Sequence, residues 1–200
     1  MTKPFVDPIS ADPDAVSKPY DDPGLTLPDG ELWVFGYGSL MWRPGIDYLE
    51  AAPAVIHGFH RALCVWSWYH RGSEAAPGLV MGLDLGGSCR GRAYRIAAEN
   101  KATVVDYLYR REMVTPVYRP RLMPARIDER TVSVLMFTVD RDHPQYAGKL
   151  SVETAAGVVV QSQGHSGHNR DYIVNMVEHL DEEGIHDAFL RRLRDEISPG

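Results

Sequence analysis

Strand-like segments come first in this chain and helix-like segments come last, and this order limits the folds that the chain can adopt. A short apolar strand is expected at 32–35. Further stretches rich in β-branched and aromatic residues, with Gly, Pro and Asp between them, are 54–68, 79–85, 91–96, 117–127 and 131–140. Helical spacing of apolar residues is found at 100–112, 152–160, 172–180 and 189–197. Because strands and helices seldom alternate, we expect an α+β fold with a small mixed or antiparallel, barrel-like sheet flanked by helices.

The composition is that of an ordinary globular domain, and it argues against two classes of partner. Of the 200 residues, 44% are hydrophobic and 24% are charged. A net charge of −6 argues against nucleic-acid binding, which usually needs a basic surface. The first residues contain no apolar signal core, no run is long enough to span a bilayer, and two cysteines form no disulfide framework. We therefore expect a cytoplasmic protein without a membrane or nucleic-acid partner, and make no prediction of its oligomeric state.

Residues 1–30 differ from the rest of the chain because prolines interrupt them repeatedly. The prolines stand at positions 4, 8, 13, 19, 23 and 28, among many aspartates. Such a segment supports neither a helix nor a central strand. We expect residues 1–30 to form an arm that is ordered only in part, and residues 31–200 to form one domain.

A glycine-rich loop follows the first expected strand. Gly36 and Gly38 flank Tyr37, and Ser39 comes next. Glycine permits a positive φ and a close approach of the backbone to a ligand, and successive N–H groups in such a turn favour oxygen anions. We expect the N–H groups between Val34 and Leu40 to bind ligand oxygens, although an ordinary tight turn would look the same.

One carboxylate falls on the apolar side of the helix expected at 100–112. Val104, Leu108 and Glu112 are spaced four residues apart, so they share the stripe that faces the core. Burial raises the pKa of a carboxyl group toward neutrality, where it can transfer protons efficiently. We take Glu112 as the candidate acid/base. The alternative is a glutamate at the helix end that swings out to solvent or pairs with Arg111 or Arg119.

The remaining candidates carry weaker signals. Asn169 is expected to cap the helix that contains Tyr172, and Arg61 on a strand is a candidate partner for a substrate carboxylate. Ser39 does not fit a hydrolase nucleophile elbow, because that motif needs glycines where Tyr37 and Met41 stand. The histidine pairs lack the companion ligands of a metal site, so we expect neither a metal nor another cofactor.

Several motifs resemble those of one enzyme family, the ChaC-type γ-glutamylcyclotransferases. The resemblance covers about residues 31–195 and rests on motifs in the same order along the chain: Phe35-Gly36-Tyr37-Gly38-Ser39-Leu40, Ser67-Trp68-Tyr69-His70-Arg71-Gly72, Gly91-Arg92-Ala93-Tyr94-Arg95, Tyr107-Leu108-Tyr109-Arg110-Arg111-Glu112, Pro144-Gln145-Tyr146-Ala147-Gly148 and Gly164-His165-Ser166-Gly167-His168-Asn169-Arg170-Asp171-Tyr172.

The resemblance implies a fold, a reaction and a set of site residues. It implies a small β-barrel flanked by helices, and cleavage of glutathione to 5-oxoproline and cysteinylglycine without a cofactor. Glu112 matches the family's catalytic glutamate. The expected substrate-binding residues are Val34, Phe35, Gly36, Tyr37, Gly38, Ser39, Leu40, Arg61 and Tyr172. Two alternatives remain open: a γ-glutamyl-amino-acid or γ-glutamyl-amine cyclotransferase, and a non-catalytic protein that binds a γ-glutamyl ligand. The segment 113–117 departs from the glycine-rich stretch of many relatives, which leaves the preferred leaving group open.

Overall fold

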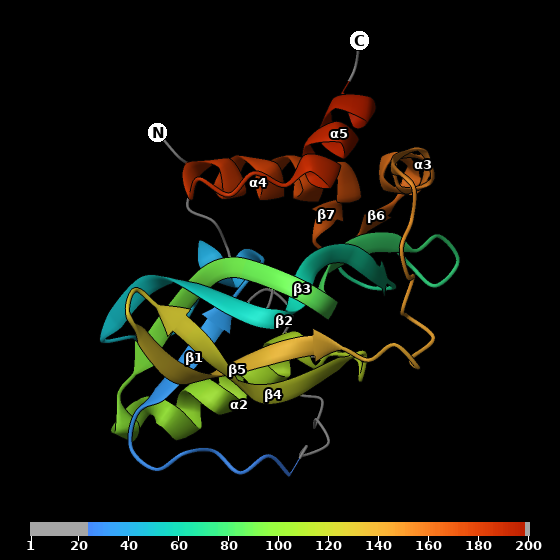
Figure 1. The fold of residues 1–200 in the computed structure, drawn as a ribbon. Helices are drawn as coiled ribbons and strands as arrows, with labels where there is room; N and C mark the ends of the chain where they lie inside the picture. Colours follow the sequence, from blue (N-terminus) through green and yellow to red (C-terminus); the bar gives the residue numbers. More distant parts are fainter. Residues whose placement is uncertain (1–23, 199–200) are drawn as a thin grey trace, which may run out of the picture.

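A computed structural model describes residues 24–198, and these residues form a closed β-barrel with helices packed outside it (Figure 1). The barrel strands are β1 (Leu32–Gly36), β2 (Glu50–Ser67), β3 (Gly78–Ile96), β4 (Tyr118–Ile127) and β5 (Arg130–Val139). Their order around the barrel is β1-β3-β2-β4-β5. Neighbours are antiparallel except for β1 and β5, which run parallel and close the barrel. The α+β fold with a mixed, barrel-like sheet, predicted from the sequence, is confirmed.

The longest strands, β2 and β3, form one hairpin that bends at a bulge. His57 pairs with Ser88 and Phe59 with Leu85, so two glycines of β3 lie opposite Gly58 of β2. Gly58, Gly86 and Gly87 all have positive φ. Two separate strands, 79–85 and 91–96, were expected from the sequence. That prediction was wrong because the glycines bend one continuous strand instead of ending it.

The helices lie on two sides of the barrel (Figure 1). On one side is α2 (Lys101–Glu112), which follows the 3-10 turn η2 (Ala98–Asn100). On the other side lie α3 (Val152–Gln161), α4 (Asn169–Glu182) and α5 (Ala188–Ile197), together with the short strands β6 (Gln163–Gly164) and β7 (Gly167–His168). All four α-helices of the part of the chain that the structure describes were predicted, each within a few residues of its bounds. Gly184, with φ of 64°, follows the end of α4 as expected.

Strand β1 is buried on both faces, which explains why its sequence is continuously apolar. Leu32 and Val34 pack with Leu108 of α2 in one cluster of buried residues. Phe35 belongs to a second cluster, which includes residues of α3, α4 and α5 such as Ile173. Successive side chains of a strand point to opposite faces, so β1 connects the two clusters through the barrel wall.

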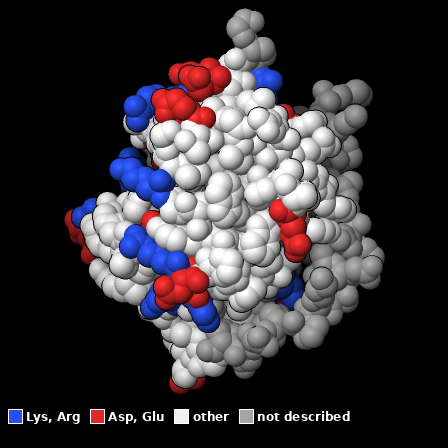
Figure 2. Space-filling view, turned by 90° about the vertical axis from the view of Figure 1, so that its right-hand side faces the viewer, with Lys and Arg blue, Asp and Glu red and all other residues white. Residues whose placement is uncertain are grey.

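The N-terminal arm is described only in part, since residues 1–23 lie outside the described residues. Residues 24–30 contain no helix or strand, and Leu25 and Leu27 pack against the cluster that contains α2. On the face drawn in Figure 2, most acidic and basic side chains of the described residues lie along one side, a few lie toward the other side, and uncharged atoms cover much of the middle. No helix within residues 24–198 is both long and apolar enough to cross a membrane.

Candidate active site

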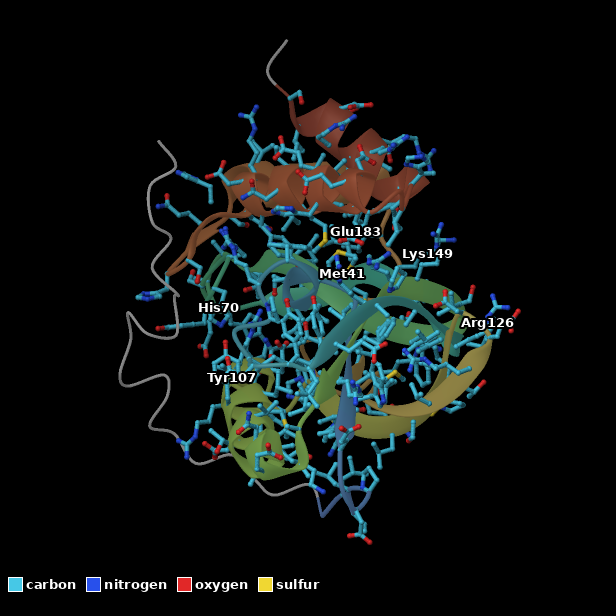
Figure 3. All side chains as sticks on the ribbon, turned by 90° about the vertical axis from the view of Figure 1, so that its left-hand side faces the viewer. Met41, His70, Tyr107, Arg126, Lys149 and Glu183 are labelled. Carbon is cyan, nitrogen blue, oxygen red and sulfur yellow. The ribbon has the colours of Figure 1, made fainter. Side chains whose placement is uncertain are left out.

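A pocket opens beside the glycine loop, where the end of α2 meets the barrel. Its cavity volume is about 470 Å³, within the range of small-molecule sites. Figure 3 shows two of its lining residues on one side of the molecule, His70 from the loop after β2 and Tyr107 from α2. Others that matter below are Tyr37, Ser39, Arg71, Glu112, Tyr118 and Tyr172.

The glycine loop forms one wall of this pocket. It turns directly from β1 into the 3-10 helix η1 (Ser39–Met41), and Tyr37, Gly38, Ser39 and Leu40 line the cavity. The Met41 N–H donates to the Gly38 carbonyl oxygen at 2.8 Å. The N–H groups of Ser39 and Leu40 precede this first helical hydrogen bond, so the helix itself does not use them. Their position fits the predicted role of loop amides as donors to ligand oxygens.

The two glycines of the loop do not use the left-handed region of backbone conformation. Neither Gly36 nor Gly38 has the positive φ that glycine permits. Gly36 is needed for another reason, because a Cβ there would lie 3.0 Å from the Leu40 Cβ and 3.1 Å from the Leu40 carbonyl carbon. The loop folds back on itself at Gly36, and the turn into η1 depends on that close approach.

Val34, Phe35 and Gly36 do not line the pocket, although they were predicted to bind substrate. They belong to β1, which pairs with β3 along its whole length and with β5 at Trp33 and Val34. The side chains of Val34 and Phe35 are fully buried. These residues place the loop, and of positions 34–40 only 37–40 line the pocket.

Arg61 also lies outside the pocket lining and supports the loop from behind. Its Nε donates to the Tyr37 carbonyl oxygen at 2.6 Å, and its Nη2 donates to the Arg90 carbonyl oxygen at 2.6 Å. The predicted contact of Arg61 with substrate is therefore replaced by a structural role: β2 uses this guanidinium to hold the loop against β3.

Glu112 ends α2 and lines the pocket with its side chain only 20% exposed. Its Oε1 accepts from the Arg111 Nε at 3.1 Å. Burial raises the pKa of the Glu112 carboxyl group above its ordinary value, and the nearby Arg111 charge opposes that rise. The helical spacing thus placed this carboxylate correctly on the inward side of the helix.

Three tyrosines surround the carboxylate. Burial and the Glu112 charge raise the pKa values of Tyr37 and Tyr118 well above 10. Burial raises the pKa of Tyr172 to about 12. The Tyr118 hydroxyl donates to the Met81 carbonyl oxygen at 2.7 Å, and the Met81 N–H donates to the Tyr172 hydroxyl at 3.1 Å. All three phenols are therefore neutral near pH 7 and enclose Glu112 without adding charge.

Tyr118 and Tyr107 were missed by the sequence analysis. Tyr118 is an aromatic residue at the start of an arginine-rich strand, and Tyr107 stands one helical turn before Arg111 on α2. The helical spacing of Tyr107 and Arg111 was the available signal, because residues four apart share one helix face.

The opposite wall of the pocket is basic and comes from the loop after β2. The guanidinium of Arg71 lies 5.2 Å from the centre of the Tyr172 ring, and its Nη1 donates to the Ser166 carbonyl oxygen at 2.6 Å. Burial lowers the pKa of His70 to about 4, and the charges of Arg71, His165 and Arg111 act in the same direction. His70 is therefore a neutral polar group near pH 7, and Arg71 supplies the positive charge.

Asn169 does not cap α4 as predicted, since the N-cap residue is His168 and Asn169 begins the helix. The fully buried side chain of Asn169 clips α4 to β3 instead. Its Oδ1 accepts from the Leu79 N–H at 2.7 Å, and its Nδ2 donates to the Leu79 carbonyl oxygen at 2.8 Å. This pair of bonds fixes Tyr172, one turn further along α4, relative to the pocket.

Taken together, fold and pocket define a class: a small α+β barrel whose pocket is lined by one carboxylate, the partly buried Glu112, beside a loop of backbone donors. Within residues 24–198 no group of three or more His, Cys, Asp or Glu side chains is placed to hold a metal ion. The family model described as "ChaC-like protein" matches residues 32–199. The chain belongs to the ChaC-like protein family.

Relatives with described functions support this placement. The chain is 33% identical over 166 residues to the glutathione-specific gamma-glutamylcyclotransferase of Escherichia coli (strain K12), covering 82% of this chain and 72% of the relative. It is 30% identical to glutathione-specific gamma-glutamylcyclotransferase 1 of Danio rerio, covering 82% and 84%. A crystal structure of a glutathione-specific gamma-glutamyl cyclotransferase from yeast shares the fold, with a TM-score of 0.76, 23% identity, and coverage of 84% and 96%.

Proposed function

We propose that this protein is a γ-glutamylcyclotransferase that cleaves glutathione to 5-oxoproline and cysteinylglycine. The observation that carries the proposal is the partly buried Glu112 carboxylate, which lines the same pocket as residues 37–40 of the glycine loop. The descriptions of the relatives from Escherichia coli and Danio rerio support glutathione as the substrate.

The reaction needs no protein nucleophile, because a γ-glutamyl compound carries its own. The α-amine attacks the γ-carbonyl carbon, a five-membered lactam forms, and the bond to the cysteine nitrogen breaks. The attacking nitrogen must lose a proton and the departing nitrogen must gain one. Glu112, with a raised pKa, is suited to take the first proton and to deliver one to the leaving amine.

The rest of the pocket would hold the substrate folded for ring closure. N–H groups of the glycine loop are the donors that could stabilise the developing oxyanion. Neutral Tyr37 and Tyr172 would exclude water around the reacting atoms, and Arg71 offers charge to a substrate carboxylate. Holding the glutamyl chain in a reactive pose contributes several kcal/mol, on the order of what intramolecular orientation supplies.

The reaction is tested by incubating the protein with glutathione in the presence of EDTA and following products by mass spectrometry. The expected products are 5-oxoproline and cysteinylglycine. Release of glutamate instead would mean that water attacks, and would overturn the proposal. Parallel incubations with γ-glutamyl dipeptides and γ-glutamyl amines test which leaving group is preferred; Val114 and Thr115, from the segment that departs from many relatives, line the pocket.

Glu112→Gln tests the acid/base assignment. Glutamine keeps the shape of the side chain but cannot accept a proton from an ammonium group, so 5-oxoproline release should fall by about 10²–10⁴. The melting temperature should stay unchanged or rise, because a desolvated carboxylate disfavours the folded state at neutral pH. A structural ion pair predicts the reverse, namely near-parental turnover and a lower melting temperature.

A further inference from the structure

Arg111 is the residue that connects the Glu112 helix to the glycine loop. Its Nε donates to the Glu112 carboxylate at 3.1 Å, and its Nη2 donates to the Ser39 hydroxyl at 3.1 Å. Its Nη1 donates to the carbonyl oxygens of Arg43 at 2.7 Å and Pro44 at 3.2 Å. The side chain is only 13% exposed. One guanidinium therefore fixes the carboxylate, the loop hydroxyl and the backbone after η1 relative to one another.

We propose that Arg111 is a positioning residue for the reaction. It holds the Glu112 carboxylate and the Ser39 hydroxyl at fixed positions relative to each other in the pocket. The inference rests on the proposed function. Arg111 makes no contact with the reacting atoms in this assignment and acts through the two groups that do. Its contacts span α2, the glycine loop and the segment after η1, and its Nη1 also donates to the Tyr107 hydroxyl at 3.2 Å.

The shape of the guanidinium explains why arginine stands here. Its donors form a planar, rigid fork, and in this site the three nitrogens point to different acceptors. A lysine ammonium carries the same charge on a flexible stem and cannot reproduce the fork. Charge and geometry can therefore be separated by substitution.

The bond to Ser39 has a chemical consequence for the loop. A hydroxyl group has one donor and two acceptor positions. Because the Ser39 oxygen accepts from Arg111, its own proton is available to donate to a ligand oxygen in the pocket that Ser39 lines. Arg111 thus orients a side-chain donor beside the backbone donors of the loop.

Among residues 24–198, Arg111 is the positively charged residue that forms an ion pair with the Glu112 carboxylate. The other groups around Glu112 are Tyr37 from the loop, Tyr118 from β4 and Tyr172 from α4, all neutral near pH 7. His70 and Arg71, from the loop after β2, and Arg43, after η1, also line the pocket. Burial favours the protonated form of Glu112, and Arg111 favours the carboxylate that accepts the proton. Loss of the Arg111 charge must therefore move ionisation of Glu112 to higher pH.

The test compares Arg111→Gln and Arg111→Lys in the full chain by measuring kcat/KM for glutathione against pH. Arg111→Gln should lower kcat/KM at pH 7 by about 10²-fold, as expected for a misplaced catalytic group, and its acidic limb should move to higher pH. Arg111→Lys should keep the limb near its parental position while kcat stays reduced, because charge is retained and the fork is lost. Arg110→Gln is the matched control, since Arg110 pairs with Asp106 on the outer side of the same helix.

The outcomes separate this inference from the proposed function. If Glu112→Gln is inactive but both Arg111 variants keep the parental pH profile and kcat, the positioning role is overturned and the function stands. An Arg111→Gln variant that merely melts earlier, with an unshifted acidic limb, also overturns it. If Arg111→Gln fails to fold, the Arg111→Lys variant alone provides the test. A kcat of Arg111→Lys equal to that of the parent would contradict the inference. Parental 5-oxoproline release by Glu112→Gln would instead end the proposed function.

Discussion

Gly36 and Gly38 stand two residues apart in the loop, yet their surroundings differ. A Cβ at Gly36 would press against Leu40 at 3.0 Å, within the loop itself. A Cβ at Gly38 would meet only the Met176 methyl group at 3.7 Å, an ordinary van der Waals distance. The loop conformation therefore depends on the first glycine, while the second leaves a lining position small.

Gly36→Ala and Gly38→Ala should consequently behave differently in thermal unfolding. Gly36→Ala should lower the free energy of unfolding by about 1–3 kcal/mol, the usual cost of overpacking, and should slow turnover because Ser39 and Leu40 move. Gly38→Ala should keep the parental melting temperature. Any loss of 5-oxoproline release by Gly38→Ala then reports contact between substrate and loop. Equal melting temperatures for Gly36→Ala and the parent would contradict this account.

At the scale of elements, α4 is tied to β3 by a side chain and not only by apolar packing. Asn169 satisfies both the N–H and the carbonyl oxygen of Leu79, which is fully buried at the site of contact. An amide side chain is suited to this task because it has a donor and an acceptor. The connection fixes the position of Tyr172 on α4 relative to Met81 on β3, and hence the shape of one pocket wall.

Asn169→Ala should therefore cost more stability than an ordinary surface change. Two buried backbone groups would lose their partners, which costs about 2–4 kcal/mol and should lower the melting temperature by about 5–15 °C. Arg170→Ala, at the next position of α4, is the matched control. A melting temperature for Asn169→Ala equal to that of the control would mean that water replaces both bonds.

At the scale of the whole molecule, the pocket is built from segments far apart in the chain, and His70 lies where two of them meet. The His165 N–H donates to the Tyr69 carbonyl oxygen at 2.9 Å, and the Ser166 N–H donates to the His70 carbonyl oxygen at 3.0 Å. The His70 Nδ1 lies 3.0 Å from the Ser166 hydroxyl. Protonation of His70 would place a second charge beside Arg71 at this junction.

Acid should accordingly destabilise the folded protein partly through His70. The pKa of His70 is about 4 in the folded protein and 6.5 ordinarily, so the unfolded chain binds the proton more readily between these values. The free energy of unfolding should fall as pH drops from 6.5 toward 4. His70→Gln should flatten that part of the dependence, whereas His57→Gln on the exposed side of β2 should not. Parallel curves for His70→Gln and the parent would refute the prediction.

The features that periodicity and composition encode were predictable, and the features that depend on tertiary contact were not. Glu112 could be assigned to the inward face because helical spacing alone decides it. The β3 strand was divided at Gly86 and Gly87 because a glycine pair reads as a turn unless the partner strand is known. Asn169 was taken for a cap because its backbone partner, Leu79, lies ninety residues away.

The arginines show the same limit. Arg61 and Arg111 are both charged residues next to motifs, and sequence cannot tell which atoms a long side chain will reach. In the structure Arg61 donates to the Tyr37 carbonyl oxygen of the loop, and Arg111 donates to the Ser39 hydroxyl that lines the pocket. The position of a residue in a strand or helix predicts the face on which its side chain lies. The hydrogen-bond acceptor depends on which distant segments of the chain pack against that face.

Closure of the barrel through β1 and β5 also bears on how the protein is made. Trp33 pairs with Val134, about a hundred residues later, so a chain emerging from the ribosome carries β1 unpaired on that side until β5 has been synthesised. Long-range pairing of this kind slows folding, and an unpaired apolar edge is a template for other chains. In the finished barrel β1 is paired on both sides, with β3 and with β5. Synthesis is therefore the stage at which this protein is most exposed to aggregation.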